Sequence, residues 1–496
     1  MNNSYLYKNK KKIIRLLDIL PGAVSWSLIL FPIWGSFAIP VIVAYYIIAF
    51  DVYWLYRSLS IAILAFIAHY KVRAYQRFDW MGDVKTFPDW QRIWHVVIIP
   101  TYTEPLHTIR KSLKGLTAQT FPTKKICVVL SFEKREGKTG RDKAAILEKE
   151  FAGKFGYFFT TFHPDIKGEV KGKSSNTSWA AKYVKKKLID EEKLNSKYMT
   201  ITSEDADAIF HPNYFACLTF KFLDDPDRYR KIYQPAVNFY NNIWKVPVIT
   251  RVFNTTASVI HMGLMLRKDR LINFSTYSVS FDTIIKAGFW DTDVIPEDYR
   301  IFFKLYFAYN GKISVEPIFL PVYEDAAQST TFFKTVNNQY QQVKRWAWGA
   351  SDDSYIIFNW LTNKKINFWQ KTLRVAKVLE DHFLWPVNWF AITIGAILPP
   401  LLNKDFGRTI LGKTLPQVSS AILTISLISL FIIIVIDWRQ RPKKDIGVSK
   451  LRQLLSPFEF ILLPLVGLIF NALPGIDAHT RLMLGKYIEY RVTEKV

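Results

Sequence analysis

The sequence predicts an α/β domain inserted between two groups of transmembrane helices, and three observations support this fold class. Half of the 496 residues are hydrophobic and 16% are aromatic, yet the formal net charge is +24. Long apolar segments flanked by lysine and arginine occur towards both ends of the chain. Between them, apolar strand-like runs alternate with helical segments, which is the pattern of an α/β sheet. A membrane protein with a basic cytoplasmic face combines these properties, whereas a soluble protein rarely does.

The positive charge restricts the partners of the chain. The basic residues are spread over loops beside apolar segments, and no recognised nucleic-acid-binding motif occurs. We therefore expect no nucleic-acid partner and expect contact with membrane lipids instead. Cys127 and Cys217 stand in apolar or aromatic surroundings without metal-ligand spacing, so both are predicted to be free thiols.

Residues 1–80 are predicted to form an N-terminal membrane region. A basic cluster at residues 8–15 precedes an apolar stretch that continues to about residue 56. Two spans are expected within it, near residues 20–36 and 38–56. Each is just long enough to cross about 30 Å of hydrocarbon at about 1.5 Å per residue.

The end of the second span carries two charged residues. Asp51 and Arg57 are expected to reach the membrane interface, because a charge at mid-membrane would cost about 3 kcal/mol or more. Residues 57–77 are amphipathic and are predicted to form an interfacial helix. Basic residues between 71 and 85 then place the following domain on the cytoplasmic side of the plasma membrane.

Residues 383–496 are predicted to form a C-terminal membrane region with two or three spans and a tail. An interfacial helix over residues 365–382 precedes them, with basic and apolar side chains at helical spacing. The spans are expected near residues 383–402, 418–436 and 457–473. The third is barely long enough, so a crossing segment and a re-entrant segment both fit the pattern.

Residues 90–350 are predicted to form one cytoplasmic domain. Two buried strands are expected, over Trp94–Pro100 and Lys125–Leu130, with a helical segment near residues 106–118 between them. This is a βαβ unit, and ligands on open parallel sheets bind at the carboxyl ends of the strands. The side chains that follow the two strands are therefore expected to face one crevice; they include Tyr102, Glu104 and Glu133.

A lysine opens a further helix of the same domain. The segment Lys171–Asn176 contains small polar residues and begins a helix that continues to about Lys187. Free backbone N–H groups and the helix dipole both favour an anion at such a helix start, so phosphate binding is predicted. An ordinary capped surface helix is the alternative.

Two aspartates follow the strand-like run Tyr198–Thr202. Asp205 and Asp207 form a D-x-D pair just past the strand end, where side chains can converge in a cleft. Mg²⁺ and Mn²⁺ prefer oxygen ligands and usually keep substrate phosphate oxygens in their shell, so few protein carboxylates are needed. The pair favours binding of a metal diphosphate, and a solvated acidic turn is the alternative.

Five short motifs in order carry a resemblance to a known family. They are Ile99–Glu104, Gly172-Lys173 with Asn176, Asp205-Ala206-Asp207, Glu297-Asp298, and Gln342-Val343-Lys344-Arg345-Trp346. In this order, over roughly residues 90–350, the chain resembles the family-2 glycosyltransferases of the membrane-integrated processive type, which include cellulose, hyaluronan and chitin synthases. The resemblance implies a nucleotide-sugar-binding, GT-A-like catalytic fold.

The resemblance also implies roles for individual residues. Asp205 and Asp207 correspond to the pair that binds Mg²⁺ or Mn²⁺, and Asp298 corresponds to the catalytic general base, with Glu297 beside it. Gln342 and Trp346 correspond to acceptor-binding residues of the Q-x-x-R-W motif. The residues that correspond to contacts with the nucleotide sugar are Thr101, Tyr102, Glu104, Lys173, Asp205 and Arg345.

One departure from the family pattern concerns the residues that are expected to bind the nucleotide. The family's second strand usually ends in an aspartate pair that helps to bind the base and ribose, whereas this chain has Leu130-Ser131-Phe132-Glu133. Glu133 is the expected substitute in nucleotide-sugar binding. The identity of the nucleotide is therefore less constrained than the reaction class.

The expected function is transfer of a sugar from a nucleotide sugar, with a UDP-sugar as the expected donor, to a growing polysaccharide with translocation. Such transfer needs a Lewis acid for the departing diphosphate and a base for the acceptor proton. A single base without a second nucleophile predicts inversion at the anomeric carbon. The alternatives are a single-sugar transferase acting on a lipid-linked acceptor and, more remotely, a non-enzymatic transporter or membrane scaffold.

Overall fold

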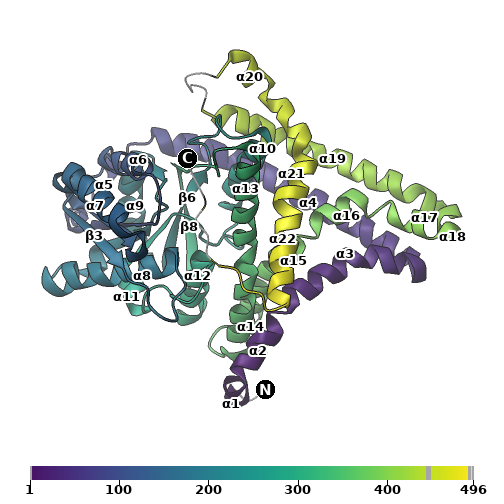
Figure 1. Ribbon diagram of the computed structural model, residues 1–496, viewed down its shortest axis with the longest axis horizontal. Helices are drawn as coiled ribbons and strands as arrows, with labels where there is room; N and C mark the ends of the chain where they lie inside the picture. The colour runs from purple at the N-terminus through teal and green to yellow at the C-terminus, as the bar shows by residue number, and fades with distance from the viewer. Residues whose placement is uncertain (1–2, 443–447, 490–492, 494–496) are drawn as a thin grey trace. The chain divides into compact units, whose positions relative to one another are not determined.

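The computed structural model describes residues 3–442, 448–489 and 493. The chain forms two compact units. One unit, here called the helical unit, contains the described residues up to Ile67 together with Trp244–Leu264 and Thr331–Glu489. The other, here called the α/β unit, contains Ala68–Ile243 and Met265–Thr330, and Figure 1 shows its sheet and the helices around it.

The described strands of the α/β unit form one mixed sheet in the order β3-β2-β1-β4-β7-β6-β8-β5. The first four in this order are parallel, β7 runs antiparallel to both β4 and β6, and β8 is parallel to β6. The strands are β1 (Trp94–Thr101), β2 (Ile126–Glu133), β3 (Tyr157–His163), β4 (Met199–Ser203), β5 (Ile209–Phe210), β6 (Lys231–Asn238), β7 (Tyr277–Ser280) and β8 (Ser314–Tyr323).

β1 and β2 are buried along almost their whole length. A parallel strand covered on both faces must be apolar throughout, which explains why both strands are continuous hydrophobic runs in the sequence. Val97 and Ile99 of β1 share a core with Ile109 and Leu113 of helix α6. The expected βαβ unit is therefore confirmed.

Helices follow the strand ends of the α/β unit, and two of them begin at residues of the expected site. Helix α8 begins at Lys173 and α12 begins at Glu297. The helices of this unit are α5 (Trp80–Val84), α6 (Leu106–Thr117), α7 (Gly137–Phe151), α8 (Lys173–Val184), α9 (Tyr214–Asp224), α11 (Phe281–Lys286) and α12 (Glu297–Ala308).

The helical unit contains the long apolar helices. Four described segments are long and apolar enough to cross a membrane: Lys10–Ala38, Pro40–Arg77, Ile410–Gln440 and Lys450–Met483. This is compatible with membrane integration. The helices are α1 (Asn3–Lys8), α2 (Lys10–Leu17), α3 (Leu20–Ala38), α4 (Pro40–Arg77), α10 (Val248–Leu264), α13 (Phe332–Ala347), α14 (Asp353–Thr362), α15 (Phe368–Leu384), α16 (Asn388–Ile394), α17 (Leu398–Leu402), α18 (Lys404–Arg408), α19 (Ile410–Gln440), α20 (Lys450–Leu455), α21 (Leu463–Gly467) and α22 (Leu473–Met483).

The span expected near residues 383–402 is not one long helix. The chain there divides into α15, α16 and α17, which are separated by turns after Leu384 and Ile394. Pro386 lies within the first turn, and Pro399 follows the second. Proline cannot donate a backbone hydrogen bond and disfavours a helical conformation in the residue before it, so a continuous helix is interrupted here.

Residues 57–77 do not form a separate helix. Helix α4 continues without a break over 38 residues, about 57 Å at about 1.5 Å per residue, so residues 57–77 continue the helix that contains the second expected span. Asp51 is fully buried within the protein. Arg57 lies 3.5 Å from Glu380 of α15 and also pairs with Asp381. Arg57 thus has acidic partners within the protein, and the expected positions of Asp51 and Arg57 at the membrane interface stay predictions.

The two units do not follow the expected domain boundaries. Residues 244–264 and 331–350 lie within the expected domain 90–350, but they belong to the helical unit. Both stretches are mainly helical and include α10 and α13. The expected functional division of the chain stays a prediction.

Candidate active site

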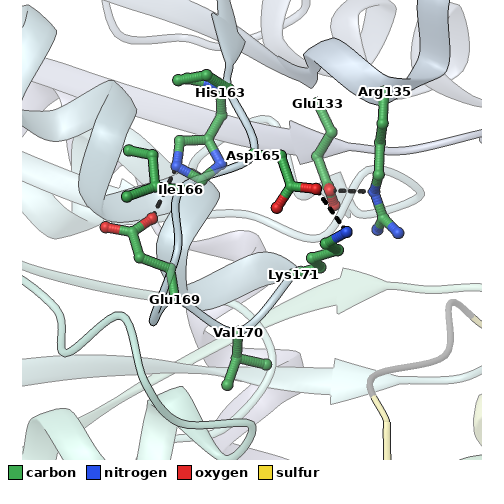
Figure 2. A pocket seen from close by; sticks show the side chains of 9 residues that line it. Glu133, Arg135, His163, Asp165, Ile166, Glu169, Val170 and Lys171 are labelled. Carbon is green, nitrogen blue, oxygen red and sulfur yellow. Dashed lines mark hydrogen bonds and ion pairs between the residues drawn. The ribbon is translucent and has the colours of Figure 1, made fainter.

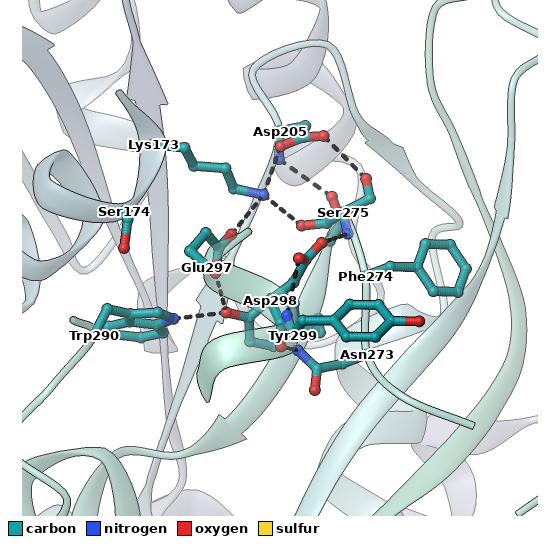
Figure 3. A network of polar contacts seen from close by, with 12 residues as sticks. Lys173, Ser174, Asp205, Asn273, Phe274, Ser275, Trp290, Glu297, Asp298 and Tyr299 are labelled. Atoms are coloured by element: carbon teal, nitrogen blue, oxygen red, sulfur yellow. Dashed lines mark hydrogen bonds and ion pairs between the residues drawn. The ribbon is translucent and has the colours of Figure 1, made fainter. Parts of the chain in front are cut away.

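The candidate active site of the α/β unit gathers charged residues from three elements. Lys173 is the first residue of α8, and Glu297 and Asp298 are the first two residues of α12. Asp205 lies in the loop that follows β4. Figure 3 shows these side chains turned towards one another around Ser275.

The ammonium group of Lys173 connects the carboxylates of the site. It lies 2.7 Å from Asp205 Oδ1 and 3.1 Å from Glu297 Oε1, and it donates a hydrogen bond to the Ser275 carbonyl. Burial acts to lower the pKa of Lys173, but Asp205, Glu297 and Asp298 outweigh burial and hold the pKa above its usual range. The lysine therefore stays positively charged among these carboxylates.

Glu297 is the more deeply buried of the two adjacent acids. Its Oε2 accepts a hydrogen bond from the Tyr277 hydroxyl at 2.7 Å, and that hydroxyl accepts one from the Trp290 indole at 2.6 Å. Burial raises the pKa of Glu297 to about 7, although Lys173 and the Tyr277 hydroxyl act to lower it. Glu297 is held by its neighbours and helps to fix Lys173.

The raised pKa of Glu297 predicts a pH-dependent contribution to stability. Because the folded-state pKa is raised from 4.5 to about 7, the stability contributed by protonated Glu297 is present below pH 4.5 and lost as the pH rises to about 7. Glu297→Gln does not titrate, so its free energy of unfolding should rise relative to wild type by up to about 3 kcal/mol across this window. Thermal unfolding of both proteins from pH 4 to pH 8 checks this. A stability difference that is constant with pH would contradict it.

Asp298 is held by backbone groups at the start of α12. Its Oδ2 accepts a hydrogen bond from the Ser275 N–H at 3.1 Å, and its Oδ1 accepts one from the Tyr299 N–H at 2.9 Å. Burial raises the pKa of Asp298, and Lys173 and these N–H groups act in the opposite direction. The carboxylate is thus oriented by the backbone, and a group in this state is suited to accept a proton.

Asp207, the second aspartate of the D-x-D pair, has a different hydrogen-bond donor from Asp205. Its Oδ2 accepts a hydrogen bond from the Asp325 N–H at 2.6 Å, while Asp205 Oδ2 accepts one from the Ser275 hydroxyl at 3.0 Å. Within residues 3–442, 448–489 and 493, no group of three or more histidine, cysteine or acidic side chains has the spacing of a metal site. Two carboxylates still fit a Mg²⁺ or Mn²⁺ ion that takes further oxygens from a diphosphate.

Two buried acids that were not predicted as site residues lie beside the D-x-D pair and Ser275. Glu204 is fully buried, and its Oε1 accepts a hydrogen bond from the Ser112 hydroxyl at 2.6 Å. Glu324 is also buried, and its Oε1 accepts from the Thr276 hydroxyl at 3.0 Å. Glu204 directly follows β4, whose residues are all buried, and this continuous burial is the signal that could have indicated its position.

The turn after β1 holds three predicted donor-binding residues. Glu104 Oε2 accepts hydrogen bonds from the Thr101 hydroxyl, at 2.8 Å, and from the Tyr102 N–H. The guanidinium of Arg135 stacks on the Tyr102 ring at 3.8 Å. The Glu104 carboxylate therefore stabilises the turn, and the Tyr102 ring lies beside residues that follow β2.

A pocket lies at the carboxyl ends of β2 and β3, where Glu133 and His163 are paired in register. Glu133 accepts a hydrogen bond from Arg135 at 2.6 Å, and His163 lies 2.9 Å from Glu169 (Figure 2). Ile166 and Val170 give the pocket apolar lining. Most of the lining is charged or polar, and its position at parallel strand ends is where ligands of open sheets bind.

The start of α8 does not present an open phosphate site. Asn176 exchanges hydrogen bonds with Ser131 of β2, and the Ser174 hydroxyl donates to the Asp291 carbonyl at 2.5 Å. The Lys173 side chain faces carboxylates instead. These polar residues anchor the helix start within the α/β unit, and phosphate binding there stays a prediction.

The Q-x-x-R-W residues lie on α13 of the helical unit. The buried amide of Gln342 accepts a hydrogen bond from Gln339 at 2.9 Å, and Gln339 in turn accepts one from Asn254 at 2.7 Å. Trp346 stacks on Phe253 of α10 with ring centroids 6.1 Å apart. These contacts fix Gln342 and Trp346 within their unit, and the expected roles of both residues and of Arg345 stay predictions.

A family model described as glycosyl transferase family group 2 matches residues 200–436. The match supports a family-2 glycosyltransferase. It spans the D-x-D pair, Glu297, Asp298 and the Q-x-x-R-W motif. The mixed sheet of the α/β unit agrees with the GT-A-like fold expected of such an enzyme. The reaction class suggested by the sequence is thus supported, whereas the processive type stays a proposal.

Solved structures of other glycosyltransferases are similar to this chain at low sequence identity. The mannosyltransferase PcManGT from Pyrobaculum calidifontis, in complex with GDP-Man and Mn²⁺, is 14% identical, with a TM-score of 0.43 over 78% of this chain and 99% of that chain. TarS 1–349 from S. aureus in complex with UDP-GlcNAc is 12% identical, with a TM-score of 0.34 over 80% of this chain and 93% of that chain. No curated protein matches the sequence.

Proposed function

We propose that the chain is a membrane-bound, metal-dependent, inverting glycosyltransferase that transfers a sugar from a nucleotide sugar, expected to be a UDP-sugar, to a growing polysaccharide. One observation carries the proposal. Ser275 donates hydrogen bonds to both Asp298, the candidate base, and Asp205, the candidate ligand of the donor diphosphate. Both carboxylates also lie next to the charged Lys173. The group that would take the acceptor proton and the group that would hold the departing diphosphate are therefore adjacent.

In the proposed reaction, the acceptor hydroxyl oxygen attacks the anomeric carbon of the donor while the bond from that carbon to the diphosphate breaks. The hydroxyl proton passes to the Asp298 carboxylate. Mg²⁺ or Mn²⁺ held by Asp205 and Asp207 would supply Lewis-acid chemistry at the diphosphate. The Lys173 ammonium, which contacts Asp205, is proposed to stabilise the negative charge that develops on the leaving group.

Asp298 is assigned as the base in preference to Glu297 because of their different surroundings. Glu297 is contacted by the Tyr277 hydroxyl and by Lys173, and its side chain is 4% exposed. Asp298 is held through backbone N–H groups, and its residue is partly exposed. An acceptor must reach the base directly, so the more accessible carboxylate suits that role. The proposed product is a β-linkage from an α-linked donor.

The pocket around Glu133 is proposed to take the nucleoside of the donor. A carboxylate and a guanidinium 2.6 Å apart offer an acceptor and donors to the edge of a base. Glu133→Gln is expected to raise the KM for the donor about tenfold with little change in kcat, because a charge-assisted hydrogen bond is lost in both the ground and transition states. Steady-state kinetics check this against Glu148→Gln, an exposed acid of α7. An unchanged KM would remove Glu133 from the donor site.

Product length tests the proposed function. The purified full-length protein in detergent or nanodiscs is incubated with the donor, Mn²⁺ and membrane lipids, and the labelled products are separated by size. Long chains support the polysaccharide synthase. One sugar added to a lipid-linked acceptor would favour the single-sugar transferase, for which the four candidate spans are equally suitable. An α-linked product from an α-linked donor would contradict inversion.

A further inference from the structure

Ser275 has an unusual backbone conformation next to the candidate active site. It precedes β7 and has a φ of +55°, in the left-handed region that favours glycine. A residue with a side chain is held there only when its surroundings enforce the conformation. Since glycine would adopt this φ without steric cost, a side chain at this position suggests that the side chain is used.

Every polar group of Ser275 contacts a residue of the site. Its N–H donates to Asp298 Oδ2 at 3.1 Å, and its carbonyl accepts from the Lys173 ammonium at 2.5 Å. Its hydroxyl lies 3.0 Å from Asp205 Oδ2, and Figure 3 shows these contacts converging on the one residue. Rotation about its N–Cα bond would change the direction of the N–H relative to the carbonyl and the side chain. All three contacts therefore depend on the left-handed conformation.

The hydroxyl of Ser275 is shared between two carboxylates. It lies 3.0 Å from Asp205 Oδ2 and 2.5 Å from Glu324 Oε1. A hydroxyl has one proton, so at any moment it donates to one of these oxygens. Glu324 has a second donor in the Thr276 hydroxyl at 3.0 Å. Glu324 thus keeps the hydrogen bond from Thr276 when the Ser275 hydroxyl donates to Asp205. When a cation binds the Asp205 carboxylate, the Ser275 hydroxyl can donate to Glu324 instead.

We propose that Ser275 is a positioning residue, which sets the orientation of the base Asp298 through its N–H and of the diphosphate ligand Asp205 through its hydroxyl. The inference rests on the proposed function, because it assigns Ser275 a role in that reaction. Ser275 does not contact the reacting atoms in this account. Its effect is to keep the groups for proton transfer and for departure of the diphosphate in one fixed arrangement.

Three substitutions of Ser275 distinguish the role of its hydroxyl from the role of its backbone conformation. Ser275→Gly and Ser275→Ala both remove the hydroxyl, and glycine also removes the steric cost of the positive φ. Ser275→Val places a β-branched side chain where φ is positive, so the segment should leave the left-handed region and turn the N–H away from Asp298. A matched control is Lys193→Val, because Lys193 is exposed and has a φ of +59°.

The measured quantities are kcat, the KM for the donor, and affinity for the nucleoside diphosphate with Mn²⁺, all on the full chain. We expect Ser275→Ala and Ser275→Gly to lower kcat about tenfold and Ser275→Val to lower it about a hundredfold. The KM and the diphosphate affinity should change by less than about threefold, because misplacement acts on the transition state. Lys193→Val should leave kcat unchanged although it introduces a similar backbone cost.

Three results would overturn the inference, and they are distinguishable. If the wild-type protein turns over a donor and the three Ser275 variants retain its kcat, Ser275 has no positioning role and the proposed function stands. If the wild-type protein turns over no donor, the proposed function fails and the inference fails with it. A variant that loses diphosphate affinity and melting temperature together with kcat would show a structural role only, which also overturns the inference.

Discussion

Asp298→Asn is expected to lower kcat about 10²- to 10⁴-fold, the usual contribution of a general base. Asparagine has nearly the shape of aspartate and can still accept a hydrogen bond from the Ser275 N–H, but it cannot take up the acceptor proton. The KM for the donor should therefore change little. Steady-state release of nucleoside diphosphate over a range of donor concentrations measures both quantities.

Asp282→Asn is the control for this substitution. Asp282 lies on α11 and pairs with Lys286 four residues later, away from the Lys173 network. Its replacement should leave kcat within about twofold of wild type, because the contacts of Asp282 are with Lys286 and Ser196 and not with the candidate site. Equal kcat values for Asp298→Asn and wild type would mean that another group is the base, and Glu297 would be the next candidate.

Lys173→Met is expected to produce the largest loss of stability, about 3–5 kcal/mol. The side chain of Lys173 is 13% exposed and lies 2.7 Å from Asp205 and 3.1 Å from Glu297, so its removal leaves acidic groups close together without their shared cation. Methionine keeps most of the side-chain volume, which isolates the effect of charge. The melting temperature in detergent should fall accordingly.

If lost charge pairing causes the destabilisation of Lys173→Met, the destabilisation should depend on pH. At pH 5, Glu297 is largely protonated, since its pKa is raised to about 7, and less negative charge is left unpaired. The difference in melting temperature between wild type and Lys173→Met should therefore be smaller at pH 5 than at pH 8. Lys187→Met, which removes an exposed partner of Glu191, should have little effect at either pH. A loss for Lys173→Met that is independent of pH would indicate packing as its cause.

The parallel half of the sheet was predictable because its signals are local. β1 and β2 are continuous apolar runs, and the apolar spacing of the segment between them matches α6. The positions of Asp205 just after β4 and of Glu133 at the end of β2 follow from the same pattern. Runs of this length, bounded by turn residues, favour burial in a parallel sheet, which brings the strand ends and the residues that follow them together.

Ser275 and Glu324 were not predictable in the same way. Ser275 acquires its positive φ from contacts with Lys173, Asp205 and Asp298, which are 23 to 102 residues away in the sequence. Glu324 reaches the site because β8 joins the sheet beside β6, a pairing between distant segments. No local pattern of polar or apolar residues encodes such non-local contacts.

The helical unit shows the limit of hydropathy as a guide. Hydropathy identified apolar segments within α3, α4 and α19 and the segment that contains α21, but it did not show that α4 continues to Arg77, that the chain breaks after Leu384 or that α22 continues to Met483. Helix continuity depends on proline positions and on partners for charged residues. Arg57 finds such partners in Glu380 and Asp381 of α15. These partners are distant in the sequence.

The most direct test of glycosyl transfer by this chain is release of nucleoside diphosphate by the purified full-length protein. The protein is incubated with a panel of UDP-, GDP- and other nucleotide sugars, with Mn²⁺ or Mg²⁺ and with EDTA in parallel. We predict metal-dependent release from one donor or a small group of donors, and its loss in EDTA. Absence of release from every donor, by protein that unfolds cooperatively and is supplied with membrane lipids, would contradict the account.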